Sequence, residues 1–330
     1  MKALFGLLLA GLITTATAAL PAPVHGQKNL LTEANEALQA GEADRAMALL
    51  DNPDDLEKQG DRAEAYNLRC RVEYALEQWN RAANDCEQAV KLDEQNSDDH
   101  LWLGRAVGEK ASRASFLTAY SLAKRTRAEF EEATRLNPRN IEALAALGEF
   151  YYTAPEMIGG GIDKAETVAA QLDKIDPVRA HELRGSIAEH RKDYGTAERE
   201  LKQAISGSQH PALQWMSLAG FYRRRERFTE MESAVRSGEN AAKRDKRTGI
   251  ALFNGAFILR ATNRDLTRAV KMLEEYLGSN LKTEEGPAFV AHTWLAQLKL
   301  QLGDTEAARR EQASALSLAH EYKPAQDMKL

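Results

Sequence analysis

Three consecutive glycines, Gly159 to Gly161, stand just before Asp163 and Lys164 in the stretch TAPEMIGGGIDKAE. Such a loop cradles phosphate when it follows the pattern G-x-x-x-x-G-K-[ST] between a strand and a helix. Here the stretch before it, IEALAALGEFYY, has the apolar spacing of a helix, and neither Ser nor Thr follows Lys164. We therefore predict a sterically permissive turn between two helices, with Asp163 near the start of the second one.

The seven histidines form no recognisable catalytic or metal-binding pattern. None belongs to an HExxH motif or to a cluster of His and Cys residues. Three of them, His100, His181 and His292, each stand four residues before a small residue, so they fall on separate helices. We predict structural or surface histidines, no catalytic site, no metal site and no cofactor, and hence no enzyme.

Two basic stretches, RRRERF at 223–228 and KRDKR at 243–247, concentrate positive charge. Clustered cations attract anionic polymers or lipid headgroups. The alternative is a solvated face, because glutamates interspersed with these stretches balance the charge. The chain as a whole has 44 Lys and Arg against 49 Asp and Glu, and its net charge of -5 argues against a nucleic-acid partner.

The elements that carry these residues are predicted to be helices. The chain has 330 residues, of which 43% are hydrophobic and 28% charged, so it can bury a core. Its 9 prolines and 7% aromatic residues suit helices better than a β-sandwich or barrel. The length alone predicts two domains, but this expectation does not hold for repeat arrays.

The N-terminus has the pattern of an export signal. Lys2 precedes an apolar run over residues 3–13 and then the small-residue stretch TTATA. The run of about eleven residues is short of the roughly 20 that span a bilayer. We predict a signal peptide over 1–26, cleaved after Ala18 or Gly26, and an exported protein, periplasmic or secreted, with no integral membrane span. The alternative is an uncleaved anchor.

The remainder of the chain repeats itself. In AERELKQAI, the residues Ala197, Leu201 and Ala204 lie on one helical face, and the same face recurs along the chain. A second helix precedes each of these, with a small residue where we expect the two helices to cross. These small residues are Cys70, Gly104, Gly148, Gly185, Ala219, Gly255 and Ala296, and the spacings Cys70 to Gly104 and Gly185 to Ala219 are both 34.

A 34-residue helix pair with these positions resembles the tetratricopeptide repeat (TPR) family. The first-helix positions are clearest at Trp215, Leu218, Ala219 and Tyr222. About seven full repeats follow a degenerate first one, so the resemblance implies an all-α solenoid over 27–320, coiled as a right-handed superhelix, with a C-terminal tail over 321–330. The third repeat has about ten extra residues between Gly104 and Thr126, which we expect to close one rim. An alternative role for the glycine-rich turn is to shape a binding edge together with this insertion.

The resemblance implies that a partner peptide or helix binds along the concave face, which the first helices line. Arg71 and Arg105 would pair there with a partner's carboxylate, or with Glu109 and Glu149 of the same groove. The Lys/Asn pattern of the chaperone-tail carboxylate clamp is not present. The implied groove residues are Asn67, Arg71, Tyr74, Arg105, Glu109, Glu149, Tyr152, Glu189, His190, Arg223, Arg224, Leu252, Leu259, Arg260 and Leu300.

The resemblance also places Cys70 and Cys86 opposite each other within one helix pair. Export would permit a disulfide between them, and the alternative is two buried thiols. The function that follows is a non-catalytic protein-binding scaffold. The alternative is a self-assembly module that forms homo-oligomers through apolar terminal repeats, with exposed Leu298, Leu300, Leu302, Leu316 and Leu318.

Overall fold

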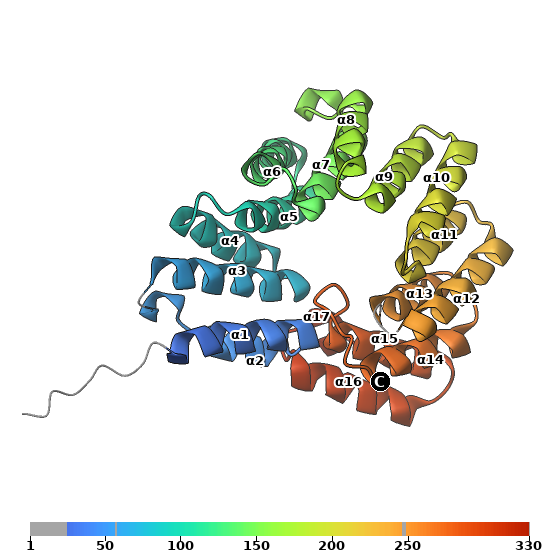
Figure 1. Cartoon of the computed structure of the whole chain (residues 1–330). Helices are drawn as coiled ribbons and strands as arrows, with labels where there is room; N and C mark the ends of the chain where they lie inside the picture. The colour runs from blue at the N-terminus through green and yellow to red at the C-terminus, as the bar shows by residue number, and fades with distance from the viewer. Residues whose placement is uncertain (1–24, 57, 246–248, 330) are drawn as a thin grey trace, which may run out of the picture.

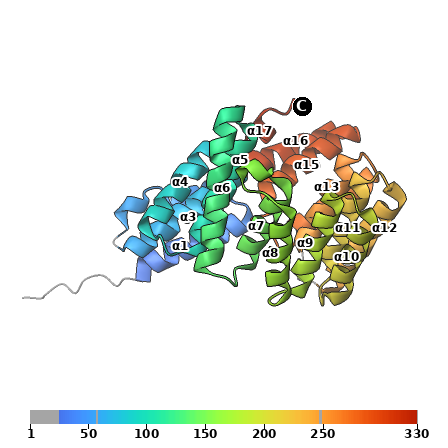
Figure 2. The same cartoon turned by 90° about the horizontal axis from the view of Figure 1, so that it is seen from above.

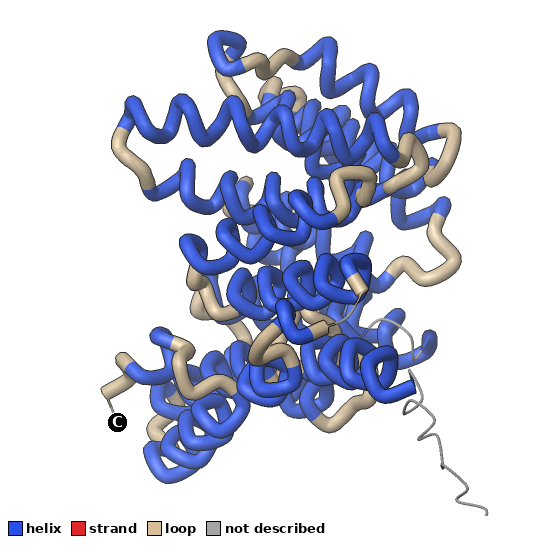
Figure 3. Tube along the Cα trace, turned by 90° about the vertical axis from the view of Figure 1, so that its left-hand side faces the viewer, coloured by secondary structure: helices blue, strands red, loops and turns tan. Residues whose placement is uncertain are grey.

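The computed structural model describes residues 25–56, 58–245 and 249–329, so the predicted signal peptide lies almost wholly outside the described part. Within these ranges the chain forms helices and loops and no strand (Figure 3). No helix there has both the length and the apolar character to cross a membrane. The helices are α1 (His25–Ala40), α2 (Ala43–Leu49), α3 (Gln59–Ala75), α4 (Trp79–Leu92), α5 (Ser97–Arg113), α6 (Phe116–Leu136), α7 (Ile141–Thr153), α8 (Ile162–Asp173), α9 (Pro177–His190), α10 (Tyr194–Gly207), α11 (Ala212–Arg224), α12 (Phe228–Asp245), α13 (Gly249–Ala261), α14 (Leu266–Leu277), α15 (Ala288–Gln301), α16 (Thr305–Leu318) and α17 (Lys323–Gln326), with short 3-10 turns at Pro53–Asp55 and Glu156–Ile158.

The helices form successive antiparallel pairs, from α1 with α2 to α15 with α16. From α3 onwards the first helix of each pair lies on the inside of a curved array and the second on the outside (Figure 1). Such pairs cannot bury their apolar faces alone and stack on their neighbours to form a continuous core. The predicted all-α TPR solenoid is thereby confirmed.

Side-chain caps and left-handed turns set the helix ends. An Asn or Asp side chain accepts a hydrogen bond from the backbone N–H at the start of α5, α7, α9, α10, α14 and α16. In most pairs the turn between the two helices contains one residue with positive φ, which reverses the chain. These residues are Gly41, Glu77, Lys192, Glu226 and Gly303, and the turn between α13 and α14 contains two, Asn263 and Asp265.

The small residues of the first helices lie where two helices come close. A Cβ atom on Gly104 would lie 2.5 Å from Phe130 of the partner helix α6, and one on Gly255 would lie 2.3 Å from Met272 of α14. Gly148 differs from the prediction, because its close neighbour is Leu183 of the next first helix, α9, at 2.5 Å.

Cys70 of α3 and Cys86 of α4 form a disulfide, with their Cα atoms 5.3 Å apart. Both side chains are fully buried within their helix pair. The bond links the two helices of one repeat and closes a loop of 16 residues in sequence.

The insertion of the third repeat lengthens helices instead of forming a loop. Helix α6 has 21 residues, whereas the second helix of the preceding pair, α4, has 14. Its extra length projects beyond the neighbouring helices on one side of the array (Figure 2). At its start Phe116 and Leu117 are exposed by 76% and 80%.

The glycine-rich turn packs against this long helix. Gly159 and Gly161 have φ of 96° and 156°, which glycine adopts without steric cost. A Cβ atom on Gly160 would lie 1.8 Å from the carbonyl oxygen of Ala154, so side chains are excluded there as well. Arg127 of α6 donates a hydrogen bond to the carbonyl of Ile158, at 3.3 Å. The turn therefore contacts α6, the helix that the insertion lengthens, and the predicted permissive turn is the conformation observed.

The two ends of the array meet and close it into a ring (Figure 1). One apolar core joins residues of α1, α2 and α3, such as Leu31 and Leu68, to Phe289, Ala315 and Tyr322 near the C-terminus. The terminal repeats of an open solenoid need polar caps. Here the first and last repeats cover each other, and the residues predicted as a tail contribute the buried Tyr322 and Ala325.

Polar contacts hold the same junction, and we call their seven residues the end clasp. Arg71 of α3 forms a two-pronged ion pair with Glu284, which lies in the loop between α14 and α15. Both N···O distances are 2.8 Å, and the side chains are only 17% and 13% exposed. The other contacts are Arg81 and Gln78 to Glu321, at 2.9 and 2.8 Å, and Asp44 to His320, at 2.8 Å.

The closed ring changes the interpretation of the C-terminal leucines. Leu298 is fully buried, and Leu316 and Leu318 pack against the core that joins the two ends. Leu300 and Leu302 are exposed by 37% and 51%. The apolar surface expected at the last helix pair is therefore largely used within the chain.

Candidate functional site

The inner face of the ring carries a concave pocket of about 800 Å³ between α7, α9, α11 and α13. Helix α11 presents Leu213, Ser217, Gly220 and Arg224 to it, at intervals of three or four residues. This spacing places them on one face of the helix, opposite the residues that pack on α12. The pocket is also lined by Glu142, Arg179, Glu182, Glu189, Arg223 and Phe257.

Ion pairs satisfy most of the charge in this pocket. Arg179 lies 2.9 Å from Glu142 and 3.1 Å from Glu182. Burial opposes the charge on Arg179, but the two carboxylates outweigh it and raise its pKa. Arg224 forms a two-pronged pair with Glu189, at 2.9 and 2.8 Å, and its hydrogen bonds to that carboxylate raise the pKa of Arg224.

Arg223 is the exception in the pocket. Its guanidinium lies 5.5 Å from the centre of the Phe257 ring, over the ring face. Its Nε is buried, and the described residues provide neither a hydrogen-bond acceptor for that atom nor an ion pair for the side chain. Phe257 is itself 37% exposed. The pocket thus presents one cation and one aromatic ring that the fold leaves available.

The basic stretch at 223–228 is otherwise neutralised. Arg225 lies over the ring of Tyr194 and 3.9 Å from Glu189, and Arg227 pairs with Glu198 at 2.6 Å. Lys246 and Arg247 of the second stretch lie outside the described residues. The arginines of 223–228 therefore do not form a continuous surface that could bind a polyanion.

The predicted groove residues of the second and third repeats lie elsewhere and contact one another. Asn67 is 7% exposed and donates a hydrogen bond to Asp99, at 2.7 Å. Tyr74 packs edge-on against Trp79 and Trp102, with ring centres 5.1 and 5.5 Å apart, and burial raises the pKa of Tyr74 to about 12. Glu109 accepts a hydrogen bond from Tyr74, at 3.5 Å.

The partners expected for the two arginines of these repeats are corrected by the structure. Arg71 pairs with Glu284 of the end clasp, and Arg105 pairs with Glu142 at 3.0 Å while lying over Trp102. Neither pairs with Glu109 or Glu149. The reason is that Glu284 reaches across the ring junction, which the repeat pattern alone does not reveal.

Three further groove residues, Glu149, Tyr152 and His190, lie on α7 and α9, whereas Leu252 and Leu259 of α13 are buried and face no groove. The Tyr152 and His190 rings contact edge-on, with centres 5.7 Å apart, and burial raises the pKa of Tyr152 to about 12. Glu149 and His190 are exposed. Of the fifteen groove residues that the resemblance implies, Glu189, Arg223 and Arg224 line the concave pocket.

The three histidines that share a repeat position each tie the two helices of one pair together. Each ring Nδ1 contacts a glutamate of the following helix, which agrees with the structural role predicted. The distances are 2.7 Å for His100 to Glu129, 2.8 Å for His181 to Glu200 and 2.7 Å for His292 to Glu311. The part of the chain that the structure describes holds no group of three or more potential metal ligands.

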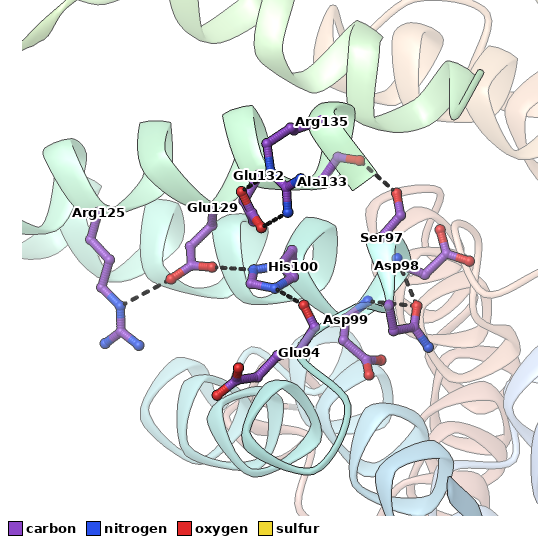
Figure 4. A network of polar contacts seen from close by, with 11 residues as sticks. Glu94, Ser97, Asp98, Asp99, His100, Arg125, Glu129, Glu132, Ala133 and Arg135 are labelled. Atoms are coloured by element: carbon purple, nitrogen blue, oxygen red, sulfur yellow. Dashed lines mark hydrogen bonds and ion pairs between the residues drawn. The ribbon is translucent and has the colours of Figure 1, made fainter. Parts of the chain in front are cut away.

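Figure 4 shows the polar contacts around His100. Its second ring nitrogen contacts the carbonyl of Glu94, at 3.2 Å. Burial acts against the charge of His100, but the hydrogen bond to Glu129 outweighs it and raises the pKa of His100. The neighbouring Asp99 is 1% exposed, and burial raises its pKa to about 7 against the opposing hydrogen bond from Asn67.

A second cavity, of about 810 Å³, lies at the ring junction. Trp79 and Arg113 line it, along with Lys110 of α5 and Lys323 of α17. Arg113 lies 4.6 Å from the centre of the Trp79 ring and also pairs with Glu109. The insertion of the third repeat therefore forms one wall of this cavity, and it does not line the pocket between α7 and α13 whose rim it was expected to close.

Glu142, Arg179 and Phe257 are pocket residues that the repeat pattern did not single out. A signal for Phe257 existed, because it follows Arg223 by 34 residues, one repeat period. Arg260 and Trp294 show the same spacing of 34. The recurrence of an arginine and an aromatic residue at the repeat period is therefore the sequence feature that marks the arginine-aromatic contacts between α11, α13 and α15, of which Arg223 and Phe257 line the pocket.

No protein-family model and no curated protein sequence matches this chain. Solved structures of similar fold include a thermophilic TPR protein from Thermus thermophilus, with 17% identity, coverage of 59% of this chain and 98% of that one, and a TM-score of 0.49. A TPR protein from Parabacteroides merdae has 13% identity, coverage of 91% and 99%, and a TM-score of 0.43. A third, described as a TPR protein with an unusual peptide-binding site, has 22% identity, coverage of 54% and 81%, and a TM-score of 0.35. The fold assignment for this chain rests on its own helix geometry.

Proposed function

We propose that this protein is a non-catalytic scaffold that binds a segment of a partner protein in the concave pocket between α7 and α13. The observation that carries the proposal is the pocket itself, about 800 Å³ in volume and formed by successive first helices. Concave sites of this size with a few oriented polar groups are typical binding sites. The paired charges keep the pocket walls in place, while Arg223 and Phe257 remain available to a ligand.

A substitution that fills the pocket tests this proposal. Gly220 faces the pocket, and a Cβ atom there would meet only the flexible end of Arg224, at 3.4 Å, so Gly220→Phe adds bulk without displacing backbone. Gly195 of the outer helix α10 has its nearest neighbour at 3.9 Å and gives the matched control Gly195→Phe.

Peptides would be selected on the purified protein from a random displayed library, and their dissociation constants measured for all three proteins. We expect Gly220→Phe to weaken binding about tenfold or more, because filling a pocket removes the contact area it offers. Gly195→Phe should bind as the parent protein does. Failure to select any peptide, or equal binding by Gly220→Phe, would overturn the proposal.

We also propose that the protein acts outside the cytoplasm, in the periplasm or after secretion. The apolar run and small-residue stretch of the N-terminus support this location, and so does a disulfide within the second repeat, since disulfides persist in oxidising compartments. N-terminal sequencing of the mature protein tests it. A first residue of Ala19 or Gln27 is expected, and an intact Met1 with a cytoplasmic location would contradict it.

A further inference from the structure

Two arginines of the inner face differ from their neighbours in having no carboxylate partner among the described residues. Arg71, Arg105, Arg179 and Arg224 each pair with a glutamate. Arg223 of α11 has no such pair. Arg260 of α13, one repeat further along the ring, donates a hydrogen bond only to the neutral Gln297, at 2.9 Å.

The two arginines and two aromatic rings form a row that crosses three successive first helices, α11, α13 and α15. Arg223 lies 5.5 Å from the centre of the Phe257 ring, which is 5.5 Å from that of Trp294. Arg260 lies 4.8 Å from the same Trp294 ring, which also stacks on Phe253 at 4.4 Å. A guanidinium held by its face on a ring keeps its N–H edge free for hydrogen bonds.

Most donors of these two guanidiniums are unused. Each guanidinium has five N–H donors, and the Nε atoms of both residues are buried without an acceptor within the described structure. Burial lowers the pKa of Arg260, and the opposing effect of the nearby Tyr322 does not offset it. An unpaired cation of this kind reduces stability, and such local conflicts tend to occur at functional sites.

We propose that Arg223 and Arg260 bind side-chain carboxylates of an acidic peptide segment, and that Phe257 and Trp294 provide the apolar surface between the two charges. The inference rests on the proposed function, because it names the class of segment that enters the concave pocket: Arg223 and Phe257 line that pocket, and Arg260 and Trp294 extend the row beyond it. A carboxylate matches the guanidinium fork with two parallel hydrogen bonds. Because the two arginines lie on successive repeats, the acidic residues that bind them must be separated along an extended segment.

A matched pair of peptides tests the inference directly. Acetyl-Glu-Glu-Phe-Glu-Glu-amide and its glutamine analogue, with every Glu replaced by Gln, differ in charge and little in shape. We expect the acidic peptide to bind at least tenfold more tightly, with an affinity that falls as salt concentration rises. Arg223→Gln and Arg260→Gln should each weaken it about tenfold.

The control variant is Arg264→Gln. Arg264 also lies over an aromatic ring, that of Phe228 at 4.9 Å, but it pairs with Glu232 at 2.6 Å. It should leave peptide affinity unchanged and lower stability. Arg223→Gln and Arg260→Gln should keep or raise the melting temperature, because they remove an unpaired charge, so loss of binding would not be due to unfolding.

The two proposals fail in different ways. If library peptides depend on Gly220 but carry no acidic residues, or if the glutamine analogue binds as well as the acidic peptide, the acidic-segment inference is overturned and the pocket remains the binding site. If no binding responds to Gly220→Phe, the pocket itself is not the site. Equal affinity of the Arg223→Gln, Arg260→Gln double variant for the acidic peptide would also overturn the inference.

Discussion

Closure of the ring depends on one close approach of backbones at Gly41, and a single methyl group should disturb it. Gly41 lies in the turn between α1 and α2, and a Cβ atom there would lie 2.1 Å from the backbone nitrogen of Ala288 at the start of α15. Carbon and nitrogen atoms in contact are normally about 3.5 Å apart. Gly41→Ala therefore forces the two ends apart by more than an ångström.

The matching turn at the other end of the chain provides the control. Both glycines have positive φ, 90° at Gly303 and 74° at Gly41. A Cβ atom on Gly303, unlike one on Gly41, would have nothing within 4 Å. Both alanine variants carry the cost of a left-handed alanine, about 1–2 kcal/mol. Only Gly41→Ala adds the cost of overpacking, about 1–3 kcal/mol, and this difference measures the close approach.

Two measurements would test this reasoning. Urea unfolding should show Gly41→Ala to be less stable than Gly303→Ala by about 1–3 kcal/mol. Spin labels on cysteines at the exposed positions 36 and 306 should give a narrow distance distribution in the parent and in Gly303→Ala, and a longer or broader one in Gly41→Ala. Equal stabilities and unchanged distances in the two variants would refute the closed ring.

Three other outcomes follow from buried features of the repeats. Replacing Cys70 and Cys86 together by serine should lower the free energy of unfolding by about 3 kcal/mol, as expected for a loop of 16 residues, and an unchanged urea midpoint would contradict the bond. Burial raises the pKa of Asp99 to about 7 and that of Glu73 to about 8, above their values of about 4 in the unfolded chain. Both carboxyls therefore bind protons more tightly in the folded state, and their stabilisation is complete below about pH 4 and is lost as the pH rises through 7 to 8. The urea midpoint should be higher at pH 5 than at pH 8, and Asp99→Asn should reduce that difference; equal dependence on pH in the variant would contradict the assignment. Gly160→Ala should destabilise the protein more than Gly195→Ala in thermal unfolding, because its Cβ atom would lie 1.8 Å from the carbonyl oxygen of Ala154.

The repeat architecture was predictable because it is local. The spacing of 34 residues between small residues and the apolar faces of the second helices follow from contacts within one helix pair, and such contacts recur along the sequence. Gly104 against Phe130 and Gly255 against Met272 show why a small residue is needed there. The same local logic located Arg223 and Arg224 on the inner face, since both occupy first-helix positions.

The ring junction was not predictable in this way. Whether Arg71 meets Glu284, 213 residues later, depends on the small rotation between each pair and the next, accumulated along the whole array. Glu284 also lies in an irregular loop, held by the bond from the Tyr276 hydroxyl to the carbonyl of Gly286, at 2.6 Å. A loop outside the repeat period leaves no periodic signal in the sequence. The repeat pattern alone therefore predicts that Arg71 binds a partner protein, although it pairs with Glu284 of the same chain.

Closure of the ring at this junction affects both the surface available for self-assembly and the shape of the pocket proposed to bind a partner. In an open array the apolar faces of the first and last repeats would be exposed, and their contact between different chains would be a heterologous interface that builds filaments. Here Phe289 and Tyr322 are 1% and 3% exposed because that contact is made within one chain. Closure therefore buries most of the apolar surface that end-to-end assembly would use, and it also fixes the curvature that spaces the pocket walls. A pre-organised pocket loses less conformational freedom on binding, so the same contact that opposes self-assembly favours the binding of a partner segment.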